Sequence, residues 1–300
     1  MSTVIPHDNI CDLAKLTMLV YDYGKKFRID NKTTIEEFVN KLSNENEKNE
    51  NEKNENEKNE NEKKNSDVLD IDCINIIEDL AKSSPYGKVH KFFNNKNTDL
   101  QAGITISETN KRISIVFRGS ESIYDWYYDL SFFKKHLHDN VYVHGGFYKQ
   151  LHNDDMYLNI TNELIELLSK NENYDIYITG HSLGAALSTL YGYELSRQLS
   201  NKITVVSFAS PRIGNGSFKV AFDKQENLKH YRISNKRDIV TAVPNINFTH
   251  VGINITLTDS KYKIFYNYDY PWYYFTLFTC WSIKEHSISL YLKRLLNYKW

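Results

Sequence analysis

The chain has 300 residues, of which 41% are hydrophobic and 14% aromatic, and its formal net charge is −1. Its apolar content suffices for a sizeable core, and its balanced charge argues against a nucleic-acid partner or electrostatic capture by an acidic membrane. Three cysteines, Cys11, Cys73 and Cys280, are too few and too scattered for a disulfide framework or a metal site.

The first twenty residues carry Asp8, Asp12 and Lys15 within an apolar stretch, so they do not have the pattern of a secretory signal. No apolar run reaches the roughly 18–20 residues that are needed to span a bilayer. We therefore expect a cytoplasmic protein without a transmembrane segment. The sequence does not indicate its oligomeric state.

A helix is predicted over residues 8–25, with Asp8 as its cap. One stripe of this helix collects the side chains that would face a core: Ile10, Leu13, Ala14, Thr17 and Tyr21. Residues 44–63 then repeat Asn-Glu-Asn-Glu-Lys without one apolar residue. Such a segment cannot bury enough surface to become ordered, so residues 43–66 are expected to be a disordered insertion, either a tolerated surface feature or an interaction tether.

Beyond the repeat, strands and helices alternate. A short helix at 72–82 precedes strands at 102–107 and 112–117, and a helix follows at 155–169. Next come a strand at 174–179, a helix at 182–199, strands at 203–208 and 229–234, and a closing helix at 286–296. This alternation predicts one α/β domain over residues 1–300, with a mostly parallel central sheet and helices on both faces.

The most informative motif is Gly180-His-Ser-Leu-Gly184, which lies between a predicted strand and a predicted helix. This context is typical of a nucleophile elbow, in which the turn holds Ser182 in a strained conformation at the carboxyl edge of the sheet. The backbone N–H of Leu183, at the positive end of the helix, is a candidate oxyanion donor. Ser120, after an earlier strand, is the second candidate, although an ordinary turn residue would look the same.

A serine nucleophile needs a base and an orienting acid, and in α/β-hydrolases these follow the serine in the order acid, histidine. Asp238, in a loop after the 229–234 strand, is the best acid, unless it is a solvated aspartate paired with Arg237 or Arg232. His250 and His286 can both be the base. We favour His286, because it lies at a loop-to-helix junction, whereas His250 begins an alternating apolar stretch.

Five ordered blocks together resemble the class 3 lipases, the fungal triacylglycerol-lipase-like branch of the α/β-hydrolases. The blocks are Phe117-Arg-Gly-Ser-Glu-Ser-Ile-Tyr-Asp-Trp-Tyr-Tyr-Asp-Leu130, Val143-His-Gly-Gly-Phe147, Thr179-Gly-His-Ser-Leu-Gly-Ala-Ala-Leu187, Phe208-Ala-Ser-Pro-Arg-Ile-Gly-Asn215 and the Asp238 loop. The chain departs from the family pattern at Thr241, where many relatives have proline, and at Glu285, where an aspartate is frequent. We interpret His144 and His181, which belong to matched motifs, as scaffold residues.

The resemblance implies the same site: Ser182 as nucleophile, Asp238 as orienter, His286 as base, and Ser120 and Leu183 as oxyanion donors. It also implies a lid after the oxyanion strand, although the aromatic residues concerned could equally be ordinary core. The apolar side of that lid would be Ile123, Tyr124, Trp126 and Tyr127. The aromatic stretch 265–281 is either core or a surface that meets acyl chains.

These observations predict a serine esterase that cleaves acylglycerols through an acyl-enzyme, without metal or organic cofactor. Its partner is a lipid or ester substrate, met in some cases at a lipid–water interface. A phospholipase A1 or a small-ester esterase is the alternative within the same class, and a catalytically silent lipase-like binding module is the alternative from another class.

Overall fold

The computed structural model describes residues 4–26, 88–95, 97–119, 133–244, 246–266 and 282–298. The Asn-Glu-Lys repeat and the helix predicted at 72–82 lie outside the described residues. No helix in these ranges is long and apolar enough to cross a membrane.

An eight-stranded sheet forms the centre of the molecule, in the order β1-β2-β3-β6-β7-β8-β9-β10. Strands β3, β6, β7, β8 and β9 are mutually parallel, while β1, β2 and β10 add antiparallel edges. The strands are β1 Lys88–Asn95, β2 Leu100–Ser107, β3 Arg112–Phe117, β6 Asp175–His181, β7 Ile203–Phe208, β8 Leu228–Asn235, β9 Ile253–Leu257 and β10 Tyr262–Phe265. A separate hairpin pairs β4 (Lys134–His138) with β5 (Val141–His144).

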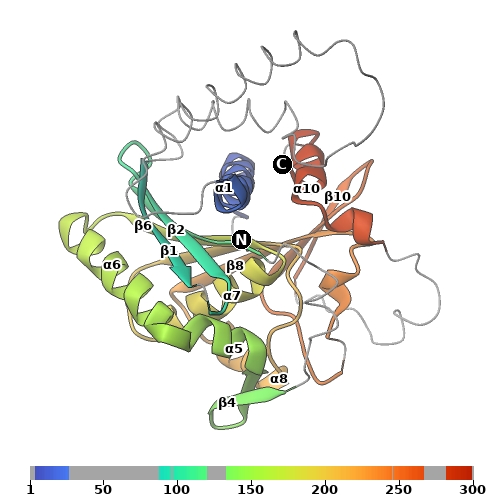
Figure 1. Cartoon of the computed structure of the whole chain (residues 1–300). Coiled ribbons are helices and arrows are strands. Elements are labelled where there is room, and N and C mark those ends of the chain that lie inside the picture. The colour runs from blue at the N-terminus through green and yellow to red at the C-terminus, as the bar shows by residue number, and fades with distance from the viewer. Residues whose placement is uncertain are drawn as a thin grey trace, which may run out of the picture.

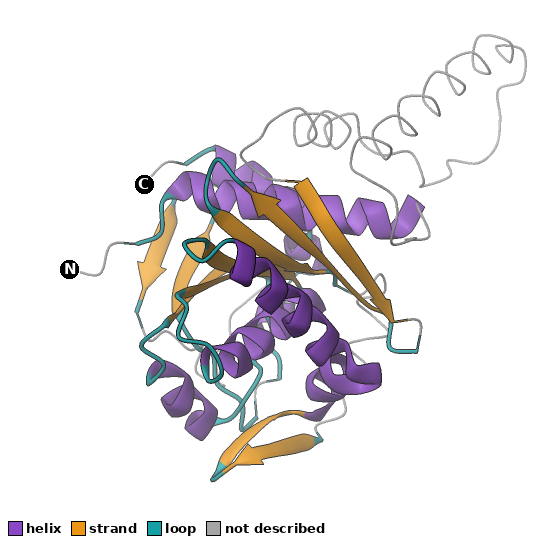
Figure 2. Ribbon diagram, turned by 90° about the vertical axis from the view of Figure 1, so that its left-hand side faces the viewer, coloured by secondary structure: helices purple, strands orange, loops and turns teal. Residues whose placement is uncertain are grey.

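Helices cover both faces of the sheet, so the predicted α/β architecture is confirmed (Figure 1). One layer holds α1 (His7–Lys26) and α10 (Ile288–Leu296). The opposite layer holds α5 (Gly145–His152), α6 (Met156–Lys170), α7 (Leu183–Ser196) and α8 (Gly216–Asp223). Figure 2 shows the same arrangement from the side, with the strands between the two sets of helices.

Side chains along each strand alternate between the two faces of the sheet, and so contribute to an apolar core on each face. In β3, Ile113 and Ile115 pack toward the α5–α8 layer, whereas Val116 packs toward α1 and α10. In β7, Val205 and Val206 divide in the same way. Successive strand side chains point to opposite faces, so a strand buried on both faces has to be apolar almost throughout.

Several predicted boundaries need correction. Helix α1 begins at His7, which places Asp8 inside its first turn, where its carboxylate favours the positive helix end, and not at the cap. The closing helix does not begin at His286: a 3₁₀ turn at Ile283–His286 comes first, and α10 starts at Ile288. The elements that the prediction missed are β1, β4, β5, β9, β10, α5 and α8.

Candidate active site

Ser182 lies in the turn between β6 and α7, at the carboxyl edge of the parallel strands. Its backbone angles are φ 59° and ψ −122°, a region that a non-glycine residue occupies only under strain. The turn is held on both sides: the Ser182 N–H donates to the Phe208 carbonyl at 3.0 Å, and the Ser182 carbonyl accepts from the N–H groups of Ala185 and Ala186. The predicted strained elbow is therefore present.

Two glycines make the elbow sterically possible. A Cβ on Gly180 would lie 2.4 Å from the carbonyl atoms of Gly184, and a Cβ on Gly184 would lie 2.2 Å from the Phe117 carbonyl oxygen. Both clashes are with backbone atoms, which cannot rotate away. The spacing of the G-x-S-x-G motif therefore reflects the close approach of α7 to the ends of β3 and β6.

Asp238 follows β8 and is completely buried, not solvated as the alternative interpretation proposed. Its carboxylate accepts the Nδ1–H of His286, with 2.9 Å to each oxygen. It also accepts the hydroxyl of Tyr291 at 2.7 Å and the N–H of Val240 at 3.0 Å. These donors satisfy the hydrogen-bonding capacity of the buried carboxylate.

His286 ends the 3₁₀ turn before α10 and is completely buried. Because Nδ1–H faces Asp238, Nε2 is left as the basic nitrogen, and within the described part of the chain this atom has no hydrogen-bond partner. The imidazole lies beside the elbow, with its ring centroid 4.6 Å from that of His181, the residue before Ser182.

His181 fixes the loop that carries His286. Its Nε2–H donates to the His286 carbonyl oxygen at 2.6 Å. Burial, and secondly the neighbouring His286, lower the pKa of His181 well below its ordinary value. The ring is therefore neutral, and its one N–H is committed to this bond. This arrangement agrees with the predicted scaffold role.

The alternative base, His250, is directed elsewhere. Its Nε2–H donates to the Thr241 carbonyl at 2.7 Å, and the Thr241 hydroxyl donates to the Asp238 carbonyl at 2.8 Å. His250 thus stabilises the loop of the acid, and the structure brings His286, not His250, to Asp238. Thr241, which departs from the family pattern, ties the loop through its hydroxyl.

Leu183 is the first residue of α7, and the first N–H groups of a helix have no partner within it. Its N–H is therefore available at the positive end of the helix for an oxyanion. Ser120 and the lid candidates Ile123, Tyr124, Trp126 and Tyr127 lie outside the described residues. What can be placed is the end of the preceding strand, because Phe117 of β3 pairs with Gly180 of β6.

His144 packs, as expected, as a neutral scaffold residue. Its ring centroid lies 4.3 Å from that of Phe147 and 5.9 Å from that of Phe248. Burial lowers its pKa to about 4.

Tyr291 is the residue that sequence reasoning missed. It lies on α10, five residues after His286, and its hydroxyl accepts the Asn235 N–H at 2.8 Å while donating to Asp238. The ring is completely buried and contacts His181 edge-on, with the centroids 6.1 Å apart. A tyrosine on the buried face of an apolar helix was the available signal, because a buried hydroxyl usually has a partner.

Both reacting side chains are buried in this structure. Ser182 is 2% exposed and His286 is 0% exposed.

Comparisons with known proteins find a lipase family model and lipase and phospholipase relatives. A family model described as "Lipase (class 3)" matches residues 114–248. A secreted mono- and diacylglycerol lipase A from Penicillium cyclopium is 30% identical over 169 residues, which cover 55% of this chain and 53% of that protein. A phospholipase A1-II 3 from rice (Oryza sativa subsp. japonica) is 44% identical over 102 residues, which cover 31% of this chain and 24% of that protein. The chain thus spans about half the length of the first of these relatives.

A solved structure of a lipase from Rhizopus microsporus var. chinensis superposes with a TM-score of 0.62 at 26% identity. The superposition covers 70% of this chain and 76% of that one.

Proposed function

Because this chain is a class 3 lipase-like protein of the α/β-hydrolase superfamily, we propose that it hydrolyses carboxylic esters of acylglycerols through a Ser182–His286–Asp238 relay. The observation that carries the proposal is the buried pair of His286 and Asp238, 2.9 Å apart, beside a strained serine elbow. A base oriented in this way activates a serine hydroxyl that is otherwise a poor nucleophile.

The reaction proceeds in two halves. Ser182 attacks the ester carbonyl while Nε2 of His286 takes its proton, and the resulting imidazolium is stabilised by Asp238. The oxyanion is held by the N–H of Leu183 and, as the resemblance implies, by Ser120. His286 then protonates the departing alkoxide, and a water molecule activated by the same nitrogen releases the acid from the acyl-enzyme.

The resemblance implies a lid whose apolar side is Ile123, Tyr124, Trp126 and Tyr127. Exposure of that side at a lipid surface would couple the opening of the lid to the interface. The cytoplasmic location remains a prediction that fractionation of the expressing cell would test. The Penicillium relative is described as secreted.

The test of the serine is Ser182→Ala. We expect hydrolysis of p-nitrophenyl butyrate to fall by at least about a thousandfold, with the circular dichroism spectrum unchanged. Ser188→Ala is the matched control: Ser188 is also a buried serine of α7, but its hydroxyl donates to the Ala185 carbonyl within the helix. Retained turnover in the Ser182 variant would refute the relay. Labelling by a fluorophosphonate probe separates an enzyme from a silent binding module, because only an activated serine reacts.

Phospholipase A1 activity is the second candidate, favoured by the 44% identity with the rice protein. A profile across triacylglycerols, diacylglycerols, phospholipids and short soluble esters decides between the two. Preferred release of the sn-1 acyl chain of phospholipids would replace the acylglycerol proposal.

A further inference from the structure

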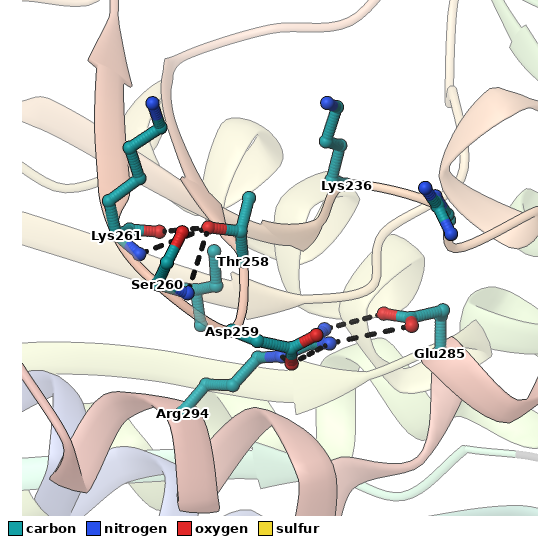
Figure 3. A pocket seen from close by; sticks show the side chains of 9 residues that line it. Lys236, Thr258, Asp259, Ser260, Lys261, Glu285 and Arg294 are labelled. Carbon is teal, nitrogen blue, oxygen red and sulfur yellow. Dashed lines mark hydrogen bonds and ion pairs between the residues drawn. The ribbon is translucent and has the colours of Figure 1, made fainter. Parts of the chain in front are cut away.

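A polar pocket of about 260 Å³ lies where β8 and β9 end (Figure 3). Three segments form its walls: the loop after β8, the turn between β9 and β10, and the C-terminal segment with Glu285, the residue before His286, and Arg294 in the last turn of α10. Strands β6, β8 and β9 run parallel in one sheet, so this is also the edge at which Ser182 lies. None of the catalytic steps above uses the pocket.

Both acidic side chains of the pocket, Asp259 and Glu285, are paired with one arginine. Arg294 donates through Nε and one terminal nitrogen to Asp259, at 2.9 and 2.5 Å, and through the other terminal nitrogen to Glu285 at 2.5 Å. Burial alone would lower the pKa of Arg294, but Glu285 and Asp259 raise it, so the guanidinium is firmly charged. The guanidinium of Arg294 therefore pairs with both carboxylates of the wall.

Three further cations of the wall have no such partner. Lys236, Arg237 and Lys261 all line the pocket and are exposed. Within the described part of the chain, none of their side chains forms an ion pair. In Figure 3 the side chains of Lys236 and Lys261 extend to the same side, above the Arg294 bridge. The site thus has a surplus of positive charge, although the net charge of the whole chain is −1.

The backbone that presents these cations is fixed. The Lys236 N–H donates to the Leu257 carbonyl at 3.1 Å, which ties the end of β8 to β9. In the following turn, the Thr258 hydroxyl donates to the Lys261 carbonyl at 2.7 Å, and the Lys261 N–H returns a bond to that hydroxyl at 3.1 Å. The backbone of the pocket is therefore preformed, which lowers the entropy lost when an anion binds.

We propose that this pocket binds a phosphate group. Two ammonium groups and a guanidinium match the charge and the several oxygens of a phosphate, and the fork of Arg237 suits two of those oxygens. The hydroxyl of Ser260, in the same wall, can donate to a further one. The volume leaves room for the group to which the phosphate is attached.

The source of the phosphate is a lipid headgroup or free phosphate. The first source rests on the proposed function. Arg237 and Glu285 of the wall directly precede Asp238 and His286, so a headgroup bound here would hold the catalytic edge against an anionic lipid surface.

The test compares two double variants that each remove two positive charges. Lys236→Gln with Lys261→Gln empties the pocket of its lysines. Lys202→Gln with Lys229→Gln is the matched control, because these exposed lysines lie at the amino ends of β7 and β8, the opposite edge of the sheet. Both are made in a Ser182→Ala background, so that ester cleavage cannot alter the lipid and binding is read independently of catalysis.

Two binding measurements distinguish the sources. Co-sedimentation uses phosphatidylcholine vesicles with and without phosphatidic acid, and calorimetry uses inorganic phosphate against sodium chloride of equal ionic strength. We expect the pocket variant to lose about tenfold or more in affinity for the phosphatidic acid vesicles, and the control less than about twofold. This result assigns the headgroup as the source.

Loss of the calorimetric signal alone, with unchanged vesicle binding, assigns free phosphate to the same pocket. Equal behaviour of the two variants in both assays overturns the proposal, because binding would then follow overall charge. Failure of the proposed function is a separate observation: the wild-type protein would not hydrolyse esters, whatever the vesicles bind.

Discussion

The carboxylate of Asp238 depends on a side chain that takes no part in proton transfer. Tyr291→Phe removes the hydroxyl that donates to Asp238 and leaves the buried Asn235 N–H without its acceptor. Because such an unpaired buried group costs about 1–3 kcal/mol, we expect the His286 loop to loosen and kcat to fall roughly tenfold, with little change in KM. Steady-state kinetics on p-nitrophenyl butyrate measures both constants.

Tyr177→Phe is the control for this substitution. Its hydroxyl accepts a long bond of 3.4 Å from Asn9 and contacts no member of the relay. Its kcat should match that of the wild type. If both variants retained full kcat, the Tyr291 hydroxyl would have no positioning role.

At the residue scale, chain order and strand ends were sufficient to select Ser182, Asp238 and His286. Their positions were predictable because each residue lies directly before or after a strand or helix, at one edge of the sheet. Tyr291 escaped because the pattern of α10 indicates only that its hydroxyl is buried and needs a partner, and does not identify that partner, which lies 53 residues earlier in the chain. The positive charge of the pocket was not predictable for the same reason. Lys236 and Lys261 are distant in the sequence and line one pocket only because β8 pairs with β9 and a turn follows β9.

At the scale of elements, the contact between α7 and β3 leads to the next prediction. Gly184→Ala would place a Cβ 2.2 Å from the Phe117 carbonyl oxygen, so α7 has to move away from the sheet and take the elbow with it. We expect a loss of at least about 3 kcal/mol in the free energy of unfolding, measured by urea denaturation.

Gly216→Ala provides the comparison. Gly216 also lies in the first turn of a helix, α8, but an added Cβ there meets nothing within 4 Å. Its unfolding midpoint should stay near that of the wild type or rise slightly. Equal destabilisation by the two substitutions would mean that the close approach of α7 to β3 is not what Gly184 provides.

Elements with a strong period were predictable, and short or weakly patterned ones were not. Strand β3 and helix α6 were found nearly to the residue, because their apolar side chains repeat at a clear period. Helix α5 begins with two glycines, which are poor helix formers, and β10 has four residues and an edge position. Helix α8 could have been found: Asn215 caps it by accepting the Phe218 N–H at 2.9 Å, a signal visible in the sequence.

At the scale of the whole molecule, four buried histidines make the fold sensitive to acid. Burial is the largest cause in each case: it lowers the pKa of His144 to about 4 and that of His230 to about 3, and it holds the pKa of His181 and His250 well below 6.5. The unfolded chain takes up these protons near pH 6.5, whereas the folded chain does not. Stability is therefore full above pH 6.5 and falls as the pH decreases toward 4.

The expected slope approaches about 1.4 kcal/mol per pH unit for each histidine, measured by urea unfolding between about pH 7.5 and about pH 4.5. His230→Gln should reduce the slope of the free energy of unfolding against pH by the contribution of one histidine. Glutamine can keep the 2.8 Å bond to the Ser207 hydroxyl but does not titrate. A free energy of unfolding that stays constant across this range would contradict the account.

Helix α1 and helix α10 come from opposite ends of the chain, yet they pack together on one face of the sheet. His7 donates to the Leu295 carbonyl at 2.9 Å, and the apolar stripe from Ile10 to Val20 shares a core with Tyr291 and Leu292. Through these contacts the helix from the beginning of the sequence supports the helix whose tyrosine orients the catalytic acid.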